Sequence, residues 1–220
     1  MPPLEKIEGK YSGEVFILGN GTTLNQYPDD FLLSRPRFGI NFFPMYHDVE
    51  ATFWSCWDSG PLKEMMPAVL ASGVKVILNP KDIEQVKNMG YTGDEFYFWK
   101  NTHKHKEFGF TSTNGVSYSS TIHWAAQVSL FLLGFDTCLV LGFDCSTGQG
   151  QNEGMGITGN PHFYDPDKEN VRHQRTWDKQ WASMIKQYQK EERGWSIKNL
   201  SVGSLAKDFP AEDWRPYYNA

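Results

Sequence analysis

The stretch VFILGNGTTLN, residues 15–25, is a buried β-strand that runs directly into a turn. Its first four residues form the continuous apolar run of a strand that is covered on both faces in a parallel sheet. Gly19 and Gly21 allow the backbone to turn tightly and to approach a ligand closely. The polar side chains that follow, beginning with Thr22, suit either a cap for the next segment or contacts to a polar ligand.

The rest of the chain alternates short apolar strands with helical segments, and this alternation predicts an α/β fold. The specific prediction is a three-layer Rossmann-like sandwich with a mostly parallel sheet, in a single domain over residues 1–220 with a long loop at about 146–170. Gly134 is expected to end the clearest helix as its C-cap. Strands are expected at 14–18, 37–43, 51–57, 75–78, 137–141 and 196–200, and helices at 62–72, 83–89, 118–133 and 170–193.

Composition limits the class of protein. Hydrophobic residues make up 40% of the 220 residues, which is enough for a sizeable core, and the net charge of −5 disfavours a general nucleic-acid binder. The three cysteines include no C-x-x-C pair, which favours a reducing compartment. The chain starts without a signal-peptide pattern and has no apolar run of about 18 residues, so a cytoplasmic protein without a membrane span is expected.

Polar residues recur where the expected strands end. Asn41, Asp58, Asn79 and Asp144 each follow or interrupt an apolar run, and the carboxyl ends of parallel strands share one edge of a sheet. Each residue alone is explained by a cap or a turn, but together they predict a ligand site at this edge. The turn at residues 19–25 is neither G-x-G-x-x-G nor a Walker loop, which argues against a dinucleotide site of the usual kind.

The order of five motifs resembles a known group of proteins. GNGTTLN, GINFF, SCWD, TSTNGVSYSS and LVLGFDCS, between about residues 15 and 144, are similar in order and spacing to the family 42 bacterial sialyltransferases. They are also similar to related Rossmann-like proteins that include archaeal 6-hydroxymethylpterin pyrophosphokinase. The resemblance implies a nucleotide-binding core without a metal-binding D-x-D motif. In the sialyltransferases the donor is a cytidine-monophosphate sugar.

The resemblance also implies roles for individual residues. Asp58 stands where the sialyltransferases have asparagine, and Cys145 and Ser146 stand where they have tyrosines that hold the leaving phosphate. Tyr164 is a candidate to replace one of these tyrosines. The implied nucleotide-binding set is Gly19, Asn20, Gly21, Thr22, Asn41, Asp58, Ser112, Thr113, Asn114, Gly115 and Asp144.

A histidine on the C-terminal side of the Gly-x-Asp motif is the base in that family, and both His162 and His173 meet this condition. Histidine suits the role because its pKa lies near neutral pH. His123, within the clearest expected helix, is interpreted as a packed histidine, and the histidines of KNTHKHK (100–106) as part of a solvated loop.

The sequence therefore predicts a metal-independent glycosyltransferase-like enzyme, with a nucleotide-activated donor, a hydroxyl-bearing acceptor and no separate cofactor. One alternative is a pyrophosphokinase or other phosphoryl transferase that uses ATP and Mg²⁺. Another is a nucleotide-binding module without catalysis. KNTHKHK leaves room for a nucleic-acid partner, although the net charge disfavours it. The aromatic tail DFPAEDWRPYYNA fits either a cover over the core or contact with a second subunit in a homo-oligomer.

Overall fold

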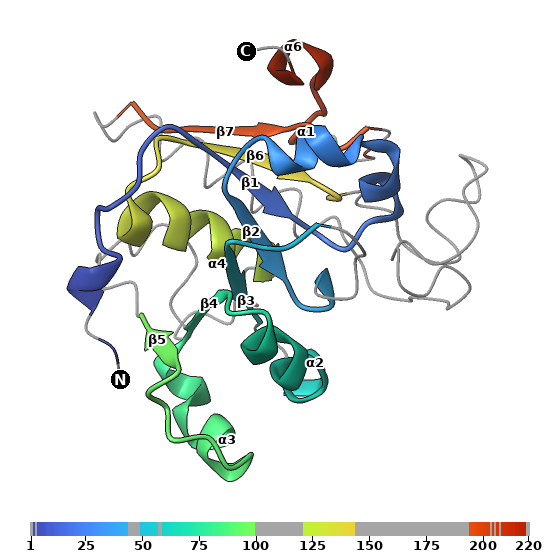
Figure 1. Cartoon of the computed structure of the whole chain (residues 1–220). Helices are drawn as coiled ribbons and strands as arrows, with labels where there is room; N and C mark the ends of the chain where they lie inside the picture. Colours follow the sequence, from blue (N-terminus) through green and yellow to red (C-terminus); the bar gives the residue numbers. More distant parts are fainter. Residues whose placement is uncertain are drawn as a thin grey trace.

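The computed structural model describes residues 2, 4–43, 49–56, 59–99, 121–143, 194–202, 204, 206 and 208–218. Within these residues, seven strands form one sheet in the order β5-β4-β3-β2-β1-β6-β7, and every neighbouring pair is parallel. The predicted α/β fold with a parallel sheet is confirmed (Figure 1). The strands are β1 (Glu14–Leu18), β2 (Arg37–Ile40), β3 (Phe53–Ser55), β4 (Lys75–Leu78), β5 (Phe96–Phe98), β6 (Thr137–Leu141) and β7 (Ser196–Asn199).

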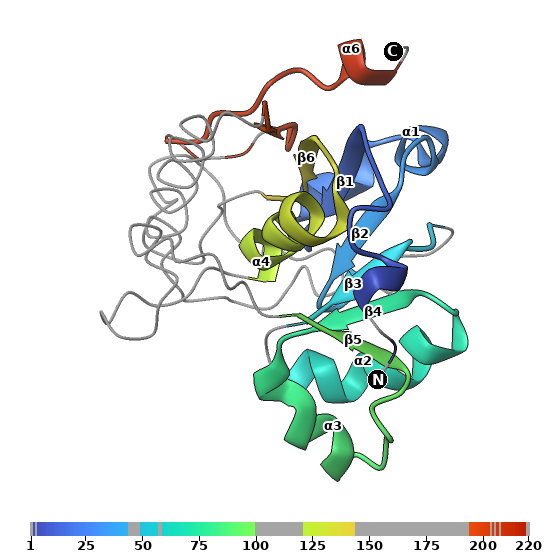
Figure 2. The ribbon, with the colours of Figure 1, turned by 90° about the vertical axis from the view of Figure 1, so that its left-hand side faces the viewer.

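Helices cover both faces of this sheet, which gives the three layers. Figure 2 shows α4 on one side of the sheet and α1 on the other. The α-helices are α1 (Asp29–Leu33), α2 (Ser59–Ala71), α3 (Ile83–Asn88), α4 (Thr121–Gln127) and α6 (Arg215–Tyr218). Three short 3-10 helices, η1 (Leu4–Lys6), η2 (Thr22–Gln26) and η4 (Pro80–Asp82), and the π-helix η7 (Val128–Leu133) complete the described elements.

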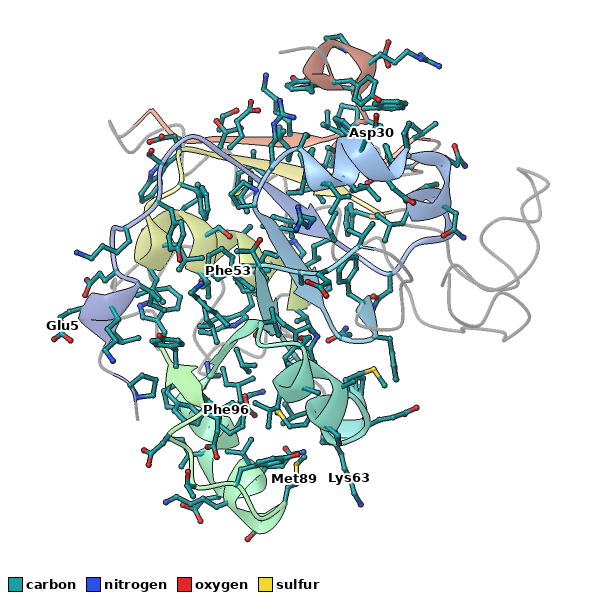
Figure 3. The ribbon with its side chains drawn as sticks, in the orientation of Figure 1. Glu5, Asp30, Phe53, Lys63, Met89 and Phe96 are labelled. Atoms are coloured by element: carbon teal, nitrogen blue, oxygen red, sulfur yellow. The ribbon has the colours of Figure 1, made fainter. Side chains whose placement is uncertain are left out.

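Successive side chains along each strand point to opposite faces of the sheet, so the hydrophobic core is divided between the two faces. In β1, Val15 and Ile17 pack in the cluster that contains α4, whereas Phe16 and Leu18 pack in the cluster that contains α1. A third cluster fills the space between the sheet and helices α2 and α3. Figure 3 shows the result, with Phe53 in the interior and Lys63 on the outside.

The expected helix at 118–133 is described from residue 121 onward, where α4 continues directly into η7. Gly134 ends it in the left-handed conformation, with φ +95°, as predicted. The expected strand at 37–43 stops at Ile40, because Asn41 also adopts a left-handed backbone with φ +48° and leaves the strand. The long loop expected at 146–170 and the helix expected at 170–193 lie outside the described residues.

The aromatic tail packs on its own chain. The ring of Trp214 lies 4.8 Å from that of Phe31 in α1, and the hydroxyl of Tyr218 donates to Asp30. The guanidinium of Arg35 donates to the carbonyl of Tyr217 at 2.8 Å. Of the two alternatives for the tail, the described contacts match the cover over the core.

Candidate functional site

The strand order reverses at β1, and this reversal identifies one edge of the sheet as the natural ligand site. From β1 the chain adds strands outward as far as β5, and it then crosses to the other side of β1 to form β6. In open α/β sheets, ligands bind outside the carboxyl ends of the strands at such a switch point. Gly19, Asn20 and Gly21 follow β1 at this point, and Gly142 follows β6. The two strands lie side by side in the sheet (Figure 1).

The turns after β1 and β6 are in close backbone contact. The amide of Gly19 donates to the carbonyl of Leu141 at 2.8 Å, and the amide of Gly21 donates to the carbonyl of Gly142 at 2.9 Å. A Cβ atom on Gly19 would lie 2.5 Å from the carbonyl oxygen of Gly142. The contact between the two turns therefore requires glycine at position 19. The sequence instead suggested a tight turn and the close approach of a ligand as the reasons for this glycine.

The segment after the turn is a short helix. Gly21 has extended backbone angles, φ −69° and ψ 148°, and precedes the five-residue 3-10 helix η2, which begins at Thr22. A helix of this length aligns few peptide dipoles and has little attraction for a phosphate. At this edge of the sheet, side chains rather than a helix N-terminus would therefore have to bind an anionic ligand.

Asn20 and Asn41 lie just beyond the carboxyl ends of two neighbouring strands. Leu18 of β1 is in register with Gly39 of β2, and each asparagine lies two residues beyond this pair. Asn20 is 8% exposed. Two of the predicted site residues are therefore brought to the same edge by adjacent parallel strands.

Asn41 has an unusual conformation and an unsatisfied polar atom. Its φ of +48° is uncommon for a residue other than glycine. Its backbone is held by β3, because its carbonyl accepts from the indole of Trp54 at 3.0 Å and its amide donates to the carbonyl of Ser55 at 3.1 Å. The side-chain Oδ1 is buried and has no hydrogen-bond partner among the described residues. A buried acceptor of this kind can be satisfied by a donor on a ligand.

The chain that leaves β6 is fixed by polar contacts to β7 and the residues after it. The hydroxyl of Ser201 accepts from the amide of Phe143 at 2.8 Å, and the hydroxyl of Ser204 donates to the carbonyl of Phe143 at 2.7 Å. Asn199 donates to the carbonyl of Phe209 at 2.8 Å and accepts from the amide of Ser201 at 3.0 Å. These contacts fix the backbone at Phe143, the last described residue after β6.

The N-terminal turn of α4 also reaches the switch point. The side chain of Ile122 would lie 3.2 Å from a Cβ atom on Gly19. His123 is fully buried, and its ring centroid lies 6.4 Å from that of Phe143. This burial agrees with the interpretation of His123 as a packed histidine.

Asp82 is a candidate that the strand-end pattern did not reveal. It ends η4, just beyond β4 and at the same edge of the sheet, and it is 6% exposed. Its Oδ2 has no hydrogen-bond partner among the described residues, and burial raises the pKa of its carboxyl group to about 6, against the opposing effect of Lys81. The nearby Asn79 accepts from the amide of Lys81 at 3.0 Å and is a cap, the simpler of its two interpretations.

The structure therefore brings together the turn after β1, Asn41 and the end of β6. The side chain of Thr22 is not described. The other predicted site residues lie outside the described residues, namely Asp58, Ser112, Thr113, Asn114, Gly115, Asp144, His162, Tyr164 and His173.

Comparison of the chain with protein-family models, with curated proteins and with solved structures finds no match. Within the described ranges, no three His, Cys, Asp or Glu side chains are grouped as the ligands of a metal ion would be. No helix in the same ranges combines the length and the apolar character needed to span a bilayer.

Proposed function

We propose that the protein binds a nucleotide-activated donor at the carboxyl ends of β1, β2 and β6, and transfers the activated group, a sugar, to a hydroxyl acceptor without a metal ion. The observation that supports this proposal is that Asn20 and Asn41 each follow the carboxyl end of a neighbouring parallel strand, beside the switch point. The resemblance to sialyltransferases favours a cytidine nucleotide as the carrier of the sugar.

Asparagine amides suit this role because they donate and accept hydrogen bonds without adding charge. The buried Oδ1 of Asn41 needs a donor, and the hydroxyl groups of ribose or the amino group of a base can supply one. Residues in sparsely populated backbone conformations cluster at active sites and ligand-binding sites. The left-handed backbone of Asn41 is consistent with such a function.

The chemistry requires a base for the acceptor hydroxyl, and His162 and His173 remain the candidates. The imidazole takes the hydroxyl proton while the acceptor oxygen forms a bond to the sugar carbon. The bond between that carbon and the phosphate oxygen breaks, and its electron pair leaves on the nucleotide phosphate. Metal-independent transfer of this kind leaves a nucleoside monophosphate as the second product when the donor is a cytidine-monophosphate sugar.

The direct test is a thermal-shift titration with cytidine monophosphate, cytidine-monophosphate sugars and other nucleotides, applied to four proteins. Wild type should show a rise in melting temperature that saturates with nucleotide concentration. Asn20→Ala and Asn41→Gly should lose this rise, whereas Asn88→Ala on the exposed end of α3 should keep it. Asn41→Gly removes the side chain and relieves the left-handed strain, so it should retain its stability without nucleotide. A wild-type protein that responds to no nucleotide would refute the proposal.

The same titration, combined with an assay of donor turnover, separates the alternative functions. A phosphoryl transferase should respond to ATP only when Mg²⁺ is present, and its turnover should stop on chelation. A binding module without catalysis should respond to a nucleotide in wild type and in a His162→Ala/His173→Ala variant alike, with no turnover of any donor. The proposed transferase should lose turnover in that double variant and keep nucleotide binding.

A further inference from the structure

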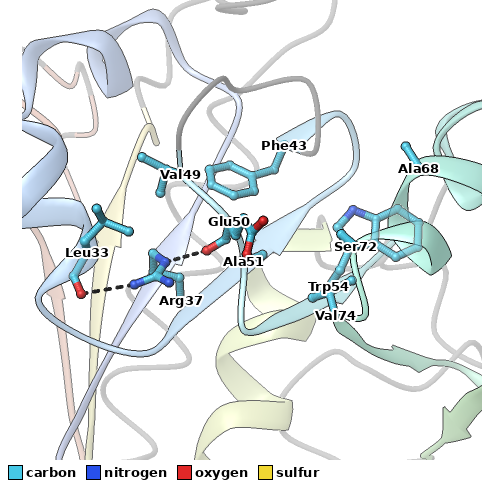
Figure 4. Close-up of a pocket in the computed structure, with 10 residues that line it drawn as sticks. All are labelled: Leu33, Arg37, Phe43, Val49, Glu50, Ala51, Trp54, Ala68, Ser72 and Val74. Atoms are coloured by element: carbon cyan, nitrogen blue, oxygen red, sulfur yellow. Dashed lines mark hydrogen bonds between the residues drawn. The ribbon is translucent and has the colours of Figure 1, made fainter.

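A groove of about 510 Å³ lies on the face of the sheet between α1 and α2, away from the switch point (Figure 4). Its volume falls within the range of about 300–1,000 Å³ that is typical of small-molecule sites. Its apolar walls include Leu33 at the end of α1, Phe43 and Val49 beside β2, Trp54 of β3 and Ala68 of α2.

The groove has a simple structural origin. A helix follows β1 and another follows β3, but the described part of the connection between β2 and β3, residues 41–43 and 49–52, forms no α-helix. Gly39, the residue of β2 that faces this gap, has no side chain to fill it. The ring of Phe43 folds back over Gly39, where a Cβ atom would collide with it. The ring therefore fills part of the gap, and the groove is the part left open.

One charged side chain is fixed in the groove. The guanidinium of Arg37 donates from Nε to the carbonyl of Glu50 at 2.6 Å, and from Nη1 to the carbonyls of Arg35 at 2.9 Å and Leu33 at 3.2 Å. No described residue accepts a hydrogen bond from its Nη2. Arg37 thus has a fixed position and a charged donor group, Nη2, that no described residue uses.

Glu50, the second charged residue in the groove, should affect a bound ligand less than Arg37 does. Glu50 also lines the groove and attracts Arg37 electrostatically, but its side chain is exposed and is within ion-pair distance of no described residue, so water screens much of its charge. The guanidinium, in contrast, is half-buried and its position is fixed by backbone carbonyls. The fixed electrostatic feature of the groove is consequently positive.

We infer that this groove binds a small organic carboxylate with an aryl or branched alkyl body. The apolar body would cover Leu33, which is 48% exposed and is one of two large hydrophobic side chains exposed among the described residues. The carboxylate would accept a charge-assisted hydrogen bond from Arg37 Nη2. This site is separate from the proposed nucleotide site and does not depend on it.

The test uses 3-phenylpropionate as the probe and the uncharged 3-phenylpropanamide as its matched control, with binding measured by isothermal titration calorimetry. Wild type should bind the carboxylate about tenfold more tightly than the amide, because the charge-assisted hydrogen bond is lost in the amide. Equal affinity for the two, or binding of neither, would overturn the inference.

Two variants of α2 provide a second, independent test of position. Ala68 lines the groove, whereas Ala71 is also exposed on the same helix and is not among the residues that line it. Ala68→Phe fills the groove and should weaken binding of 3-phenylpropionate at least tenfold, while Ala71→Phe should leave it unchanged. Similar affinity in the two variants would show that the probe binds elsewhere and would contradict the inference. The comparison of carboxylate with amide in wild type needs neither variant to fold.

Discussion

Two parts of the carboxyl edge differ in how their buried polar groups are paired. At the end of β6 and β7, the amide and the carbonyl of Phe143 are both hydrogen-bonded, and Asn199 and Ser201 hold each other in place. At the ends of β2 and β4, Asn41 Oδ1 and Asp82 Oδ2 are buried without partners among the described residues. We call the first part the β6–β7 rim and the second the β2–β4 rim.

We infer from this contrast that the β6–β7 rim stabilises the fold, whereas the β2–β4 rim is available to bind a ligand. A fully paired network contributes to rigidity, and removal of one member leaves another buried group unsatisfied. Unpaired buried atoms cost stability, and they are retained where a ligand can satisfy them. The β6–β7 rim is thus expected to be sensitive to substitution, whereas the β2–β4 rim should gain stability when its polar atoms are removed.

The largest effect is expected for Gly19→Ala, where β1 meets the β6–β7 rim. The added Cβ atom would lie 2.5 Å from the backbone oxygen of Gly142, and backbone cannot move aside as a side chain can. We expect a loss of about 3 kcal/mol in the free energy of unfolding, measured by urea denaturation. Gly60→Ala in α2 is the control, because nothing lies within 4 Å of its Cβ position. Equal stability of the two variants would show that the turns after β1 and β6 are not packed as described.

Ser201→Ala should have the next largest effect, because it leaves the buried amide of Phe143 without its acceptor. The expected loss is about 2 kcal/mol in the same assay. Ser72→Ala, which removes an exposed hydroxyl that donates to the carbonyl of Val69, should cost less than about 0.5 kcal/mol. If Ser201→Ala proves as mild as Ser72→Ala, the two rims do not differ in the way proposed.

Asp82→Asn should act in the opposite direction. The folded-state pKa of Asp82 is raised to about 6 from its usual value of 3.8, so the ionised carboxylate destabilises the fold above pH 6 and protonation removes this cost as the pH falls. The variant should be more stable than wild type by about 1–3 kcal/mol at pH 8, and the difference should disappear by about pH 4. Thermal denaturation at a series of pH values measures this. A variant that is less stable than wild type at pH 8 would mean that the carboxylate has a favourable partner.

Much of the fold could be predicted from the sequence. The continuous apolar runs at 14–18, 75–78 and 137–141 correspond to the full lengths of β1, β4 and β6, because each run ends at a glycine or an asparagine that breaks the strand. The strand β5 was not predicted, since its three residues show no period. The helix α1 was missed for the same reason, with five residues. The strand β3 is as short as β5, but it lies within the longer stretch ATFWSCW at 51–57, which the sequence marks as a strand.

The candidate site was predictable only in part. Parallel strands bring Asn20 and Asn41 to one edge, and this follows from the pattern of strand ends. The contact between Gly19 and Gly142 depends on the strand order, which no local pattern contains. The burial of Asp82 depends on how the chain turns after β4. The spacing of hydrophobic residues in the sequence does not predict the direction of such a turn.

Backbone NMR of the ¹⁵N-labelled protein, titrated with cytidine monophosphate, tests most directly whether a nucleotide binds beside the switch point. The proposal predicts saturable shifts at the amides of Gly19, Asn20, Asn41 and Phe143, at the ends of β1, β2 and β6, with little change at Ala51 and Ala68 in the groove. Shifts confined to the groove, or no shift at a saturating nucleotide concentration, would contradict it.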